Sequence, residues 1–251
     1  MSTQLYQQRS SIINQARLQL QATNRYRAWS ILLLSAVVSC ESYAWLLHSW
    51  WISAGFVFLI ICHELGHYCV ARWYGYSPSL PVLIPFLGAV IFLDDGKIPY
   101  VRSAVIAAAG PIIGSVATIP FLLVAQVTQN TDCFFIAILG FVTNIFNLIP
   151  LYPLDGGRIV AAISPYIWGL GAMIAAFFTI LLNPWVLIVL GVVTIVNIYL
   201  HTQSPVWAMS WARGGLQSCR PPIFQRIVIA ILYASLVAIL IGGCYWYCFI
   251  L

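Results

Sequence analysis

The chain has 251 residues, of which 62% are apolar and only 7% are charged, and its formal net charge is +5 at pH 7. An average soluble domain carries about 25% charged residues, which keep its surface hydrated. The composition therefore excludes soluble globular, disordered and disulfide-scaffold proteins, and it predicts an all-α polytopic membrane protein.

Seven apolar stretches approach the roughly 20 residues that a helix needs to cross the hydrocarbon core of a bilayer. In chain order they occupy residues 29–47, 52–71, 103–127, 133–151, 166–182, 185–200 and 227–250. The fifth and sixth are short, and the turn residues Asn183 and Pro184 separate them. We therefore expect about six or seven transmembrane helices in a single membrane domain, residues 29–251, after a polar arm, residues 1–28.

The positive charges indicate how this domain is oriented. If the N-terminus lies in the cytoplasm, every Lys and Arg falls on that side of the membrane, in the N-terminal arm or in the loops near 72–102, 152–158 and 201–226. The loops on the opposite side contain no Lys or Arg. Because cytoplasmic loops are enriched in these residues, we expect a cytoplasmic N-terminus. The net charge is then explained by topology, and no nucleic-acid partner is expected.

The second apolar stretch contains the sequence His63-Glu64-Leu65-Gly66-His67. Residues four apart share one face of a helix, so both imidazoles can contact one zinc ion, with Glu64 beside them as a general base. An ionisable residue in hydrocarbon costs on the order of 2.5–3.5 kcal/mol, so Glu64 is expected to have a function. The alternative is that both histidines pack as polar residues of a bundle while Glu64 pairs with an arginine.

The apolar run from Pro81 to Leu93 is too short to cross the bilayer as a helix, and it starts and ends on the cytoplasmic side. Its prolines and glycine disfavour a continuous helix, whereas the β-branched and aromatic residues near its end suit a strand. We therefore expect a membrane-dipping loop or a β-hairpin. An exposed strand edge there could pair with an unwound substrate. The alternative is a passive hydrophobic plug.

A catalytic zinc site usually has three protein ligands. Asp155 is the candidate for the third, because it ends the fourth apolar stretch at the same depth as His63 and His67. Zinc, two neutral histidines and two ionised carboxylates also sum to zero charge, which favours burial. The rival ligands are two aspartates in a predicted exposed turn, Asp94 and Asp95. Weaker candidates lie in or beside the spans, and they are Glu41, His48, Cys62, Cys69, Asp132 and His201.

The residues around Asp155 predict irregular backbone. Pro150 and Pro153 interrupt helical hydrogen bonding just before it, and Gly156 and Gly157 let the backbone approach a metal closely. Irregular backbone at membrane depth is tolerated where it lines a protein-buried or water-filled cavity, and hydrolysis requires such a cavity. The alternative is a simple helix end terminated by proline.

The H-E-x-x-H sequence together with Asn147–Arg158, NLIPLYPLDGGR, closely resembles the site-2 protease family of intramembrane zinc metalloproteases. That family carries H-E-x-x-H on one transmembrane helix and N-x-x-P-x-x-P-x-D-G on a later one. The segment Ala109–Gly114 resembles an intervening motif whose last position is often Asn and is Gly114 here. The resemblance covers residues 50–160 approximately, and we expect a compact form without PDZ or CBS modules.

The resemblance implies a zinc-dependent endopeptidase that hydrolyses locally unwound transmembrane segments of membrane proteins. It implies one Zn²⁺ per chain, held by His63, His67 and Asp155, with Glu64 as the general base. Asn147 would hold the substrate or stabilise the oxyanion; a helix–helix hydrogen bond is the alternative role. Relatives place a membrane-dipping element beside the active site, so three residues of this run are expected to present the substrate: Phe86, Gly88 and Ala89.

The implied location is a bacterial or cyanobacterial plasma membrane, or an organelle membrane of bacterial descent. Two other classes of function remain as alternatives. A catalytically idle scaffold or assembly factor would be expected to have lost a ligand or the base, and all four groups are present. A metal transporter would need ionisable ligands on both sides of the membrane, whereas the outward loops offer His48, Asp132 and little else.

Overall fold

The computed structural model describes residues 26–86, 88–93, 98–181 and 221–250. Several predictions concern residues outside this part of the chain. They are the first 25 residues of the N-terminal arm, the sixth apolar stretch, the rival ligands Asp94 and Asp95, and His201.

The described residues form mainly helices, and four of these helices are long and apolar enough to cross a membrane. The four are Tyr26–Leu47, α2 (Trp50–Trp73), α3 (Tyr100–Thr128) and α9 (Ile223–Ile250). The shorter elements are α4 (Thr131–Asn147), α5 (Asp155–Ile163), the 3₁₀ turn η2 (Pro165–Ile167) and α6 (Trp168–Leu181). The prediction of a polytopic helical membrane protein is confirmed.

Polar side chains cap the N-termini of two of these helices. The Ser49 hydroxyl accepts a hydrogen bond from the Ile52 amide at the start of α2, and the Asn130 side chain accepts one from the Cys133 amide at the start of α4. Each side chain satisfies an amide that has no partner within its own helix. The α3–α4 connection is short, so the two helices pack side by side.

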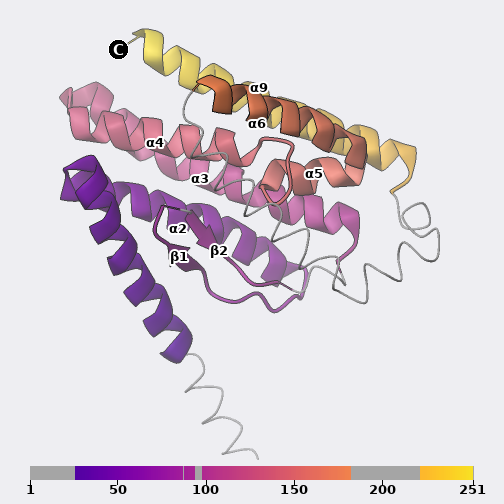
Figure 1. The fold of residues 1–251 in the computed structure, drawn as a ribbon, viewed down its shortest axis with the longest axis horizontal. Helices are drawn as coiled ribbons and strands as arrows, with labels where there is room; N and C mark the ends of the chain where they lie inside the picture. Colours follow the sequence, from indigo (N-terminus) through magenta and orange to yellow (C-terminus); the bar gives the residue numbers. More distant parts are fainter. Residues whose placement is uncertain (1–25, 87, 94–97, 182–220, 251) are drawn as a thin grey trace, which may run out of the picture.

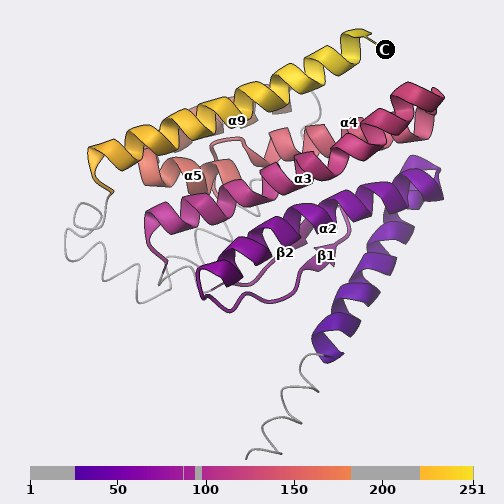
Figure 2. The same cartoon turned by 180° about the vertical axis from the view of Figure 1, so that it is seen from behind.

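The helices form a layered bundle with α3 at its centre (Figures 1 and 2). On one side α3 packs against α2, and on the other it contacts α4 and α5, which α9 covers. The approach of α2 to α3 depends on Gly66, because a Cβ there would lie 2.5 Å from the carbonyl oxygen of Ala109. Small residues allow such close helix contacts in membranes, where no hydrophobic force drives helices together.

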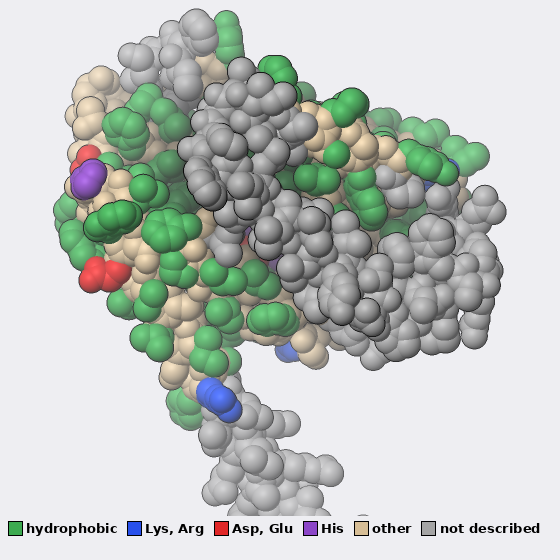
Figure 3. All heavy atoms as spheres, viewed as in Figure 1, with side chains coloured by type: hydrophobic (Ala, Val, Ile, Leu, Met, Phe, Trp, Pro, Cys, Tyr) green, Lys and Arg blue, Asp and Glu red, His purple; other side chains and the backbone are tan. Residues whose placement is uncertain are grey.

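The surface is that of a protein surrounded by lipid. Apolar side chains cover much of the described face in Figure 3, and charged ones are few. Three tryptophans near helix ends are largely exposed, Trp45, Trp51 and Trp73, at 76%, 78% and 79%. Amphipathic indole rings favour the boundary between hydrocarbon and headgroups, so these positions suit a membrane-spanning bundle.

A short β-hairpin follows α2, as the sequence predicted. Strands β1 (Val82–Ile84) and β2 (Gly88–Val90) pair antiparallel, with Leu83 opposite Ala89. The Tyr26–Leu47 helix holds the hairpin through Ser35, whose hydroxyl accepts a hydrogen bond from the Leu83 amide at 3.2 Å. Tyr43 of the same helix packs edge-on against Phe86 in the turn, with ring centroids 5.8 Å apart.

The irregular backbone predicted just before Asp155 is confirmed, but the fourth helix is shorter than the fourth apolar stretch. Helix α4 ends at Asn147, and Asp155 is the first residue of α5. Between them the chain forms short-range turns, such as the hydrogen bond from the Leu154 amide to the Leu151 carbonyl at 2.9 Å. The two prolines of this segment cannot donate helical hydrogen bonds, although its apolar residues continue the hydrophobic pattern of α4.

Candidate metal centre

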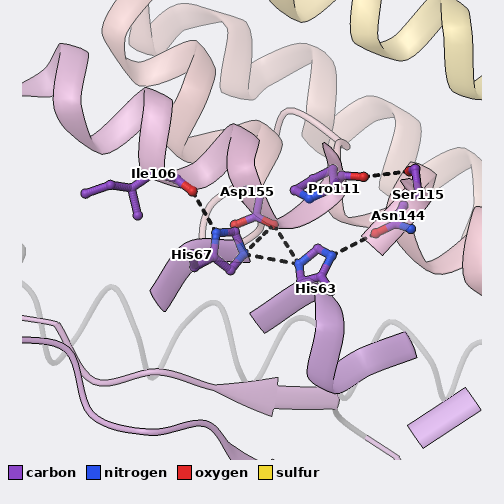
Figure 4. A network of polar contacts seen from close by, with 7 residues as sticks. All are labelled: His63, His67, Ile106, Pro111, Ser115, Asn144 and Asp155. Atoms are coloured by element: carbon purple, nitrogen blue, oxygen red, sulfur yellow. Dashed lines mark hydrogen bonds and ion pairs between the residues drawn. The ribbon is translucent and has the colours of Figure 1, made fainter. Parts of the chain in front are cut away.

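Three buried side chains converge between α2, α3 and α5 (Figure 4). His63 and His67 stand one turn apart on α2, and their Nε2 atoms are 3.1 Å apart. Asp155 faces both from the start of α5, with Oδ2 3.1 Å from His63 Nε2 and 3.2 Å from His67 Nε2. All three side chains are at most 9% exposed. The structure thus brings together the three residues that the sequence predicted as zinc ligands.

These three atoms fit a zinc ion. Ligands about 2.0–2.1 Å from zinc at tetrahedral corners lie roughly 3.3 Å from one another, close to the separations found here. Two imidazole nitrogens and one carboxylate oxygen are a usual donor set for a catalytic site, which keeps a fourth position for water or substrate.

The outer nitrogen of each histidine also has a partner. His67 Nδ1 donates to the carbonyl oxygen of Ile106 in α3 at 2.8 Å, and because a carbonyl can only accept, this nitrogen carries the proton. In the neutral imidazole that binds a metal, the lone pair of His67 is therefore on Nε2, the atom that faces Asp155. His63 Nδ1 lies 2.8 Å from Oδ1 of Asn144 in α4. Metal-binding histidines usually have such an outer partner, which fixes the ring.

Asn144 and Ile106 were not predicted from the sequence. Asn144 is 2% exposed in an otherwise apolar helix, one turn before Asn147. A buried amide among apolar residues was a signal that could have been followed, because intramembrane Asn side chains need hydrogen-bond partners. Ile106 contributes through its backbone carbonyl, and no residue type marks such a contact.

A cavity of about 60 Å³ lies beside His63. A cavity of about 10–15 Å³ is enough for one water, so this one has room for several. It brings together a predicted ligand, the predicted base, the predicted oxyanion residue, two hairpin residues and two residues that were not predicted. Its lining is Ile60, His63, Glu64, Gly88, Ala89, Thr143 and Asn147. Phe86 is outside this lining; it packs on Tyr43 and is 55% exposed.

The hairpin turns one strand edge toward this cavity. The Leu83 amide donates to Ser35, so Leu83 directs its backbone groups away from β2. In an antiparallel pair, directly opposed residues share this orientation, and Ala89 opposes Leu83. The N–H and C=O groups of Ala89 therefore point away from β1. Because Ala89 also lines the cavity, β2 presents a free backbone edge beside Glu64, an edge that has no hydrogen-bond partner among the described residues.

Within the described residues, no other group of three His, Cys, Asp or Glu side chains converges as these do. The described candidates outside the cluster are Glu41, His48, Cys62, Cys69 and Asp132. The rival ligands Asp94 and Asp95 are outside the described part of the chain, so the structure leaves them untested.

Comparison with known proteins gives one family and several relatives. The model of peptidase family M50 matches residues 51–134 and 128–190, which together are more than half of the chain. The chain is 36% identical over 109 residues to the zinc metalloprotease MJ0392 of Methanocaldococcus jannaschii, a match that covers 41% of this chain and 31% of that protein. It is 27% identical over 104 residues to stage IV sporulation protein FB of Bacillus subtilis, covering 41% and 36%. The matched part thus spans about a third of each relative.

Proposed function

This chain belongs to peptidase family M50, and on that premise we propose that it is a zinc-dependent endopeptidase that cleaves membrane proteins within the bilayer. The observation that carries the proposal is the convergence of His63, His67 and Asp155 inside a bundle of apolar helices, with Glu64 lining the adjacent cavity. A buried cluster of this kind at membrane depth is costly without a metal and a reaction to serve.

We assign His63, His67 and Asp155 as the ligands of one Zn²⁺. When bound, zinc polarises the scissile carbonyl and lowers the pKa of water at the site. The three side chains hold their positions through different elements, because Ile106 of α3 fixes His67 and the start of α5 fixes Asp155. The site therefore depends on the packing of α2, α3 and α5 rather than on a loop.

Glu64 is the general base of this proposal. It follows His63 in α2, so its side chain leaves the helix about 100° around the axis and lines the cavity instead of the cluster. From there its carboxylate accepts a proton from the attacking water and returns it to the leaving amine. Such proton transfers typically contribute about 10²–10⁴-fold to a rate.

Asn147 is proposed to act on the substrate carbonyl. It lines the same cavity as Glu64, from the last turn of α4. Its amide N–H can donate to the carbonyl oxygen as negative charge develops there. Removing one such donor costs about 2.7–4 kcal/mol of transition-state stabilisation in a well-studied protease.

The proposed substrate is a transmembrane segment that has locally unwound. A helical segment hides its amides in its own hydrogen bonds, whereas an extended one can pair with the free edge of β2 at Ala89. Gly88 and Ala89 would then present the peptide to Glu64. The distribution of Lys and Arg supports a cytoplasmic N-terminus and cleavage near the cytoplasmic face, and we place the protein in a bacterial or cyanobacterial plasma membrane.

The proposal is tested by comparing membrane proteomes, scored by N-terminal peptides, of cells that carry the native chain or Glu64→Gln. We expect new membrane-protein N-termini with the native chain that are absent with Glu64→Gln, while both purified proteins hold equal zinc. Glu41→Gln is the matched control, because it makes the same change at an exposed carboxyl on another helix. Identical N-termini for the native chain and Glu64→Gln, with zinc bound in both, would support the idle-scaffold alternative instead.

A further inference from the structure

Asn144 is an amide that is almost fully enclosed, and its oxygen faces one of the proposed ligands. The side chain is 2% exposed, and Oδ1 lies 2.8 Å from His63 Nδ1 (Figure 4). Oδ1 carries no proton, so His63 Nδ1 is the donor in this hydrogen bond. In the neutral imidazole the other ring nitrogen, Nε2, then carries the lone pair, and it faces Asp155 and His67.

We propose that Asn144 is a positioning residue that fixes the tautomer and ring orientation of His63, and that Gly114 of α3 makes the room for its amide. The inference rests on the proposed zinc site. Without an acceptor at Nδ1, His63 could carry its proton on Nε2, where it would donate to Asp155 and occupy the lone pair that a metal needs. His67 does not depend on Asn144, because the Ile106 carbonyl already fixes its tautomer.

The space around Asn144 supports this role. A Cβ at Gly114 would lie 2.6 Å from Asn144 Oδ1 and 3.0 Å from Nδ2, which is too close for unbonded atoms. Any other residue at position 114 would therefore displace the amide from His63. Asn144 and Gly114 form one unit across the α3–α4 contact, in which the larger side chain comes from α4.

The same distance predicts that the two positions can exchange roles, with the asparagine on α3 and the small residue on α4. A separation of 2.6 Å is close to that between the Cβ and Oδ1 atoms of a single asparagine, which are two bonds apart. An asparagine at position 114 could therefore place its own Oδ1 near the point that the Asn144 oxygen occupies, provided that position 144 is small. We infer that the acceptor for His63 can be supplied from either helix.

The test measures zinc affinity of the purified full chain by competition with a chelator. The variants are Asn144→Ala, Gly114→Asn, the double variant Gly114→Asn/Asn144→Ala, and the control Thr118→Ala. Thr118 is as buried as Asn144 and lies at the same contact, but its hydroxyl donates within its own helix, to the Gly114 carbonyl at 2.8 Å. Its loss should affect packing and leave His63 unchanged.

We expect Asn144→Ala to bind zinc about 10–100-fold more weakly, the usual effect of losing an outer partner of a ligand, while Thr118→Ala stays close to the native protein. Gly114→Asn alone should also bind weakly, and the double variant should regain most of the affinity. Native affinity in Asn144→Ala would overturn the positioning role. A double variant no better than Asn144→Ala would overturn the exchange of roles.

A spectroscopic measurement and the folding of the variants complete the test. The visible spectrum of the cobalt-substituted protein should change in Asn144→Ala and return in the double variant, which a loss of packing alone would not produce. If Asn144→Ala does not fold, the double variant decides: native affinity supports the proposal, and weakened affinity in a folded double variant overturns it. A native chain that binds no zinc would instead contradict the proposed function.

Discussion

Gly110 of α3 lies directly against the imidazole of His67. A Cβ at position 110 would be 2.2 Å from His67 Nε2 and 2.8 Å from His63 Nε2, so no side chain can stand there while both rings keep their places. One turn earlier on the same helix, the Ile106 carbonyl accepts the His67 proton. Thus α3 shapes the metal centre without contributing a ligand. Gly110 leaves room for the imidazole rings because it has no side chain, and the Ile106 carbonyl orients His67.

The contact predicts the effect of Gly110→Ala. The added methyl group must push at least one imidazole away from Asp155, so zinc affinity should fall at least about tenfold, as for other changes that misplace a ligand. Titration of the purified protein with zinc against a chelator measures this. Gly242→Ala is the matched control, because a Cβ at that exposed position meets no atom within 4 Å. Equal zinc affinity in Gly110→Ala and the native chain would contradict the described geometry.

Asp155→Ala should also weaken zinc binding, for a different reason. It removes the single negative charge among the three proposed ligands and leaves two neutral imidazoles to hold the ion. Glu64→Gln, which removes the neighbouring carboxylate charge, should keep zinc, because Glu64 lines the cavity and not the cluster. Zinc content after extensive dialysis compares the two variants. Equal zinc occupancy in Asp155→Ala and the native protein would remove Asp155 from the ligand set.

The parts of the fold that the sequence predicted are those with local causes. The paired histidines follow from the four-residue spacing on a helix, and the hairpin follows from an apolar run interrupted by Pro and Gly. The end of α4 was misplaced for the same kind of reason: Leu148, Ile149 and Leu151 continue its hydrophobic pattern, although the prolines have already ended the helix. Hydropathy alone does not separate a buried turn from a buried helix.

The parts of the site that were missed depend on contacts between helices. Asn144 faces His63 because α4 packs against α2 and α3 at this register, and Gly114 and Gly110 matter for the atoms opposite them. Ile106 contributes a carbonyl oxygen that every residue possesses. Such contacts are set by tertiary packing, and a single sequence contains no periodic signal for them.

Tyr233 of α9 connects the C-terminal helix to the segment before Asp155. Its hydroxyl donates to the carbonyl oxygen of Leu148 at 2.5 Å, just past the end of α4. Tyr233→Phe leaves that carbonyl without this donor in an apolar interior, so we expect the free energy of unfolding to fall by about 1–3 kcal/mol. Thermal unfolding in one fixed detergent measures the change. Tyr166→Phe, at an 85% exposed position, should leave the melting temperature unaltered, and an equal melting temperature for both variants would contradict the expectation.

Substrate pairing with β2 makes a prediction that separates cleavage from metal binding. The N–H of Ala89 points away from β1, so a proline at this position removes a donor from the free edge and none from the hairpin. We expect Ala89→Pro to lower cleavage of a membrane-protein substrate at least about tenfold, with near-native zinc content and melting temperature. Ala89→Gly is the control, because it keeps the amide and should retain cleavage.

Ile91, two residues on, directs its amide the same way if the strand alternation continues, so Ile91→Pro provides a second test outside β2. Unchanged cleavage in folded Ala89→Pro and Ile91→Pro would show that substrate does not pair with this edge and would favour the passive-plug alternative for the hairpin.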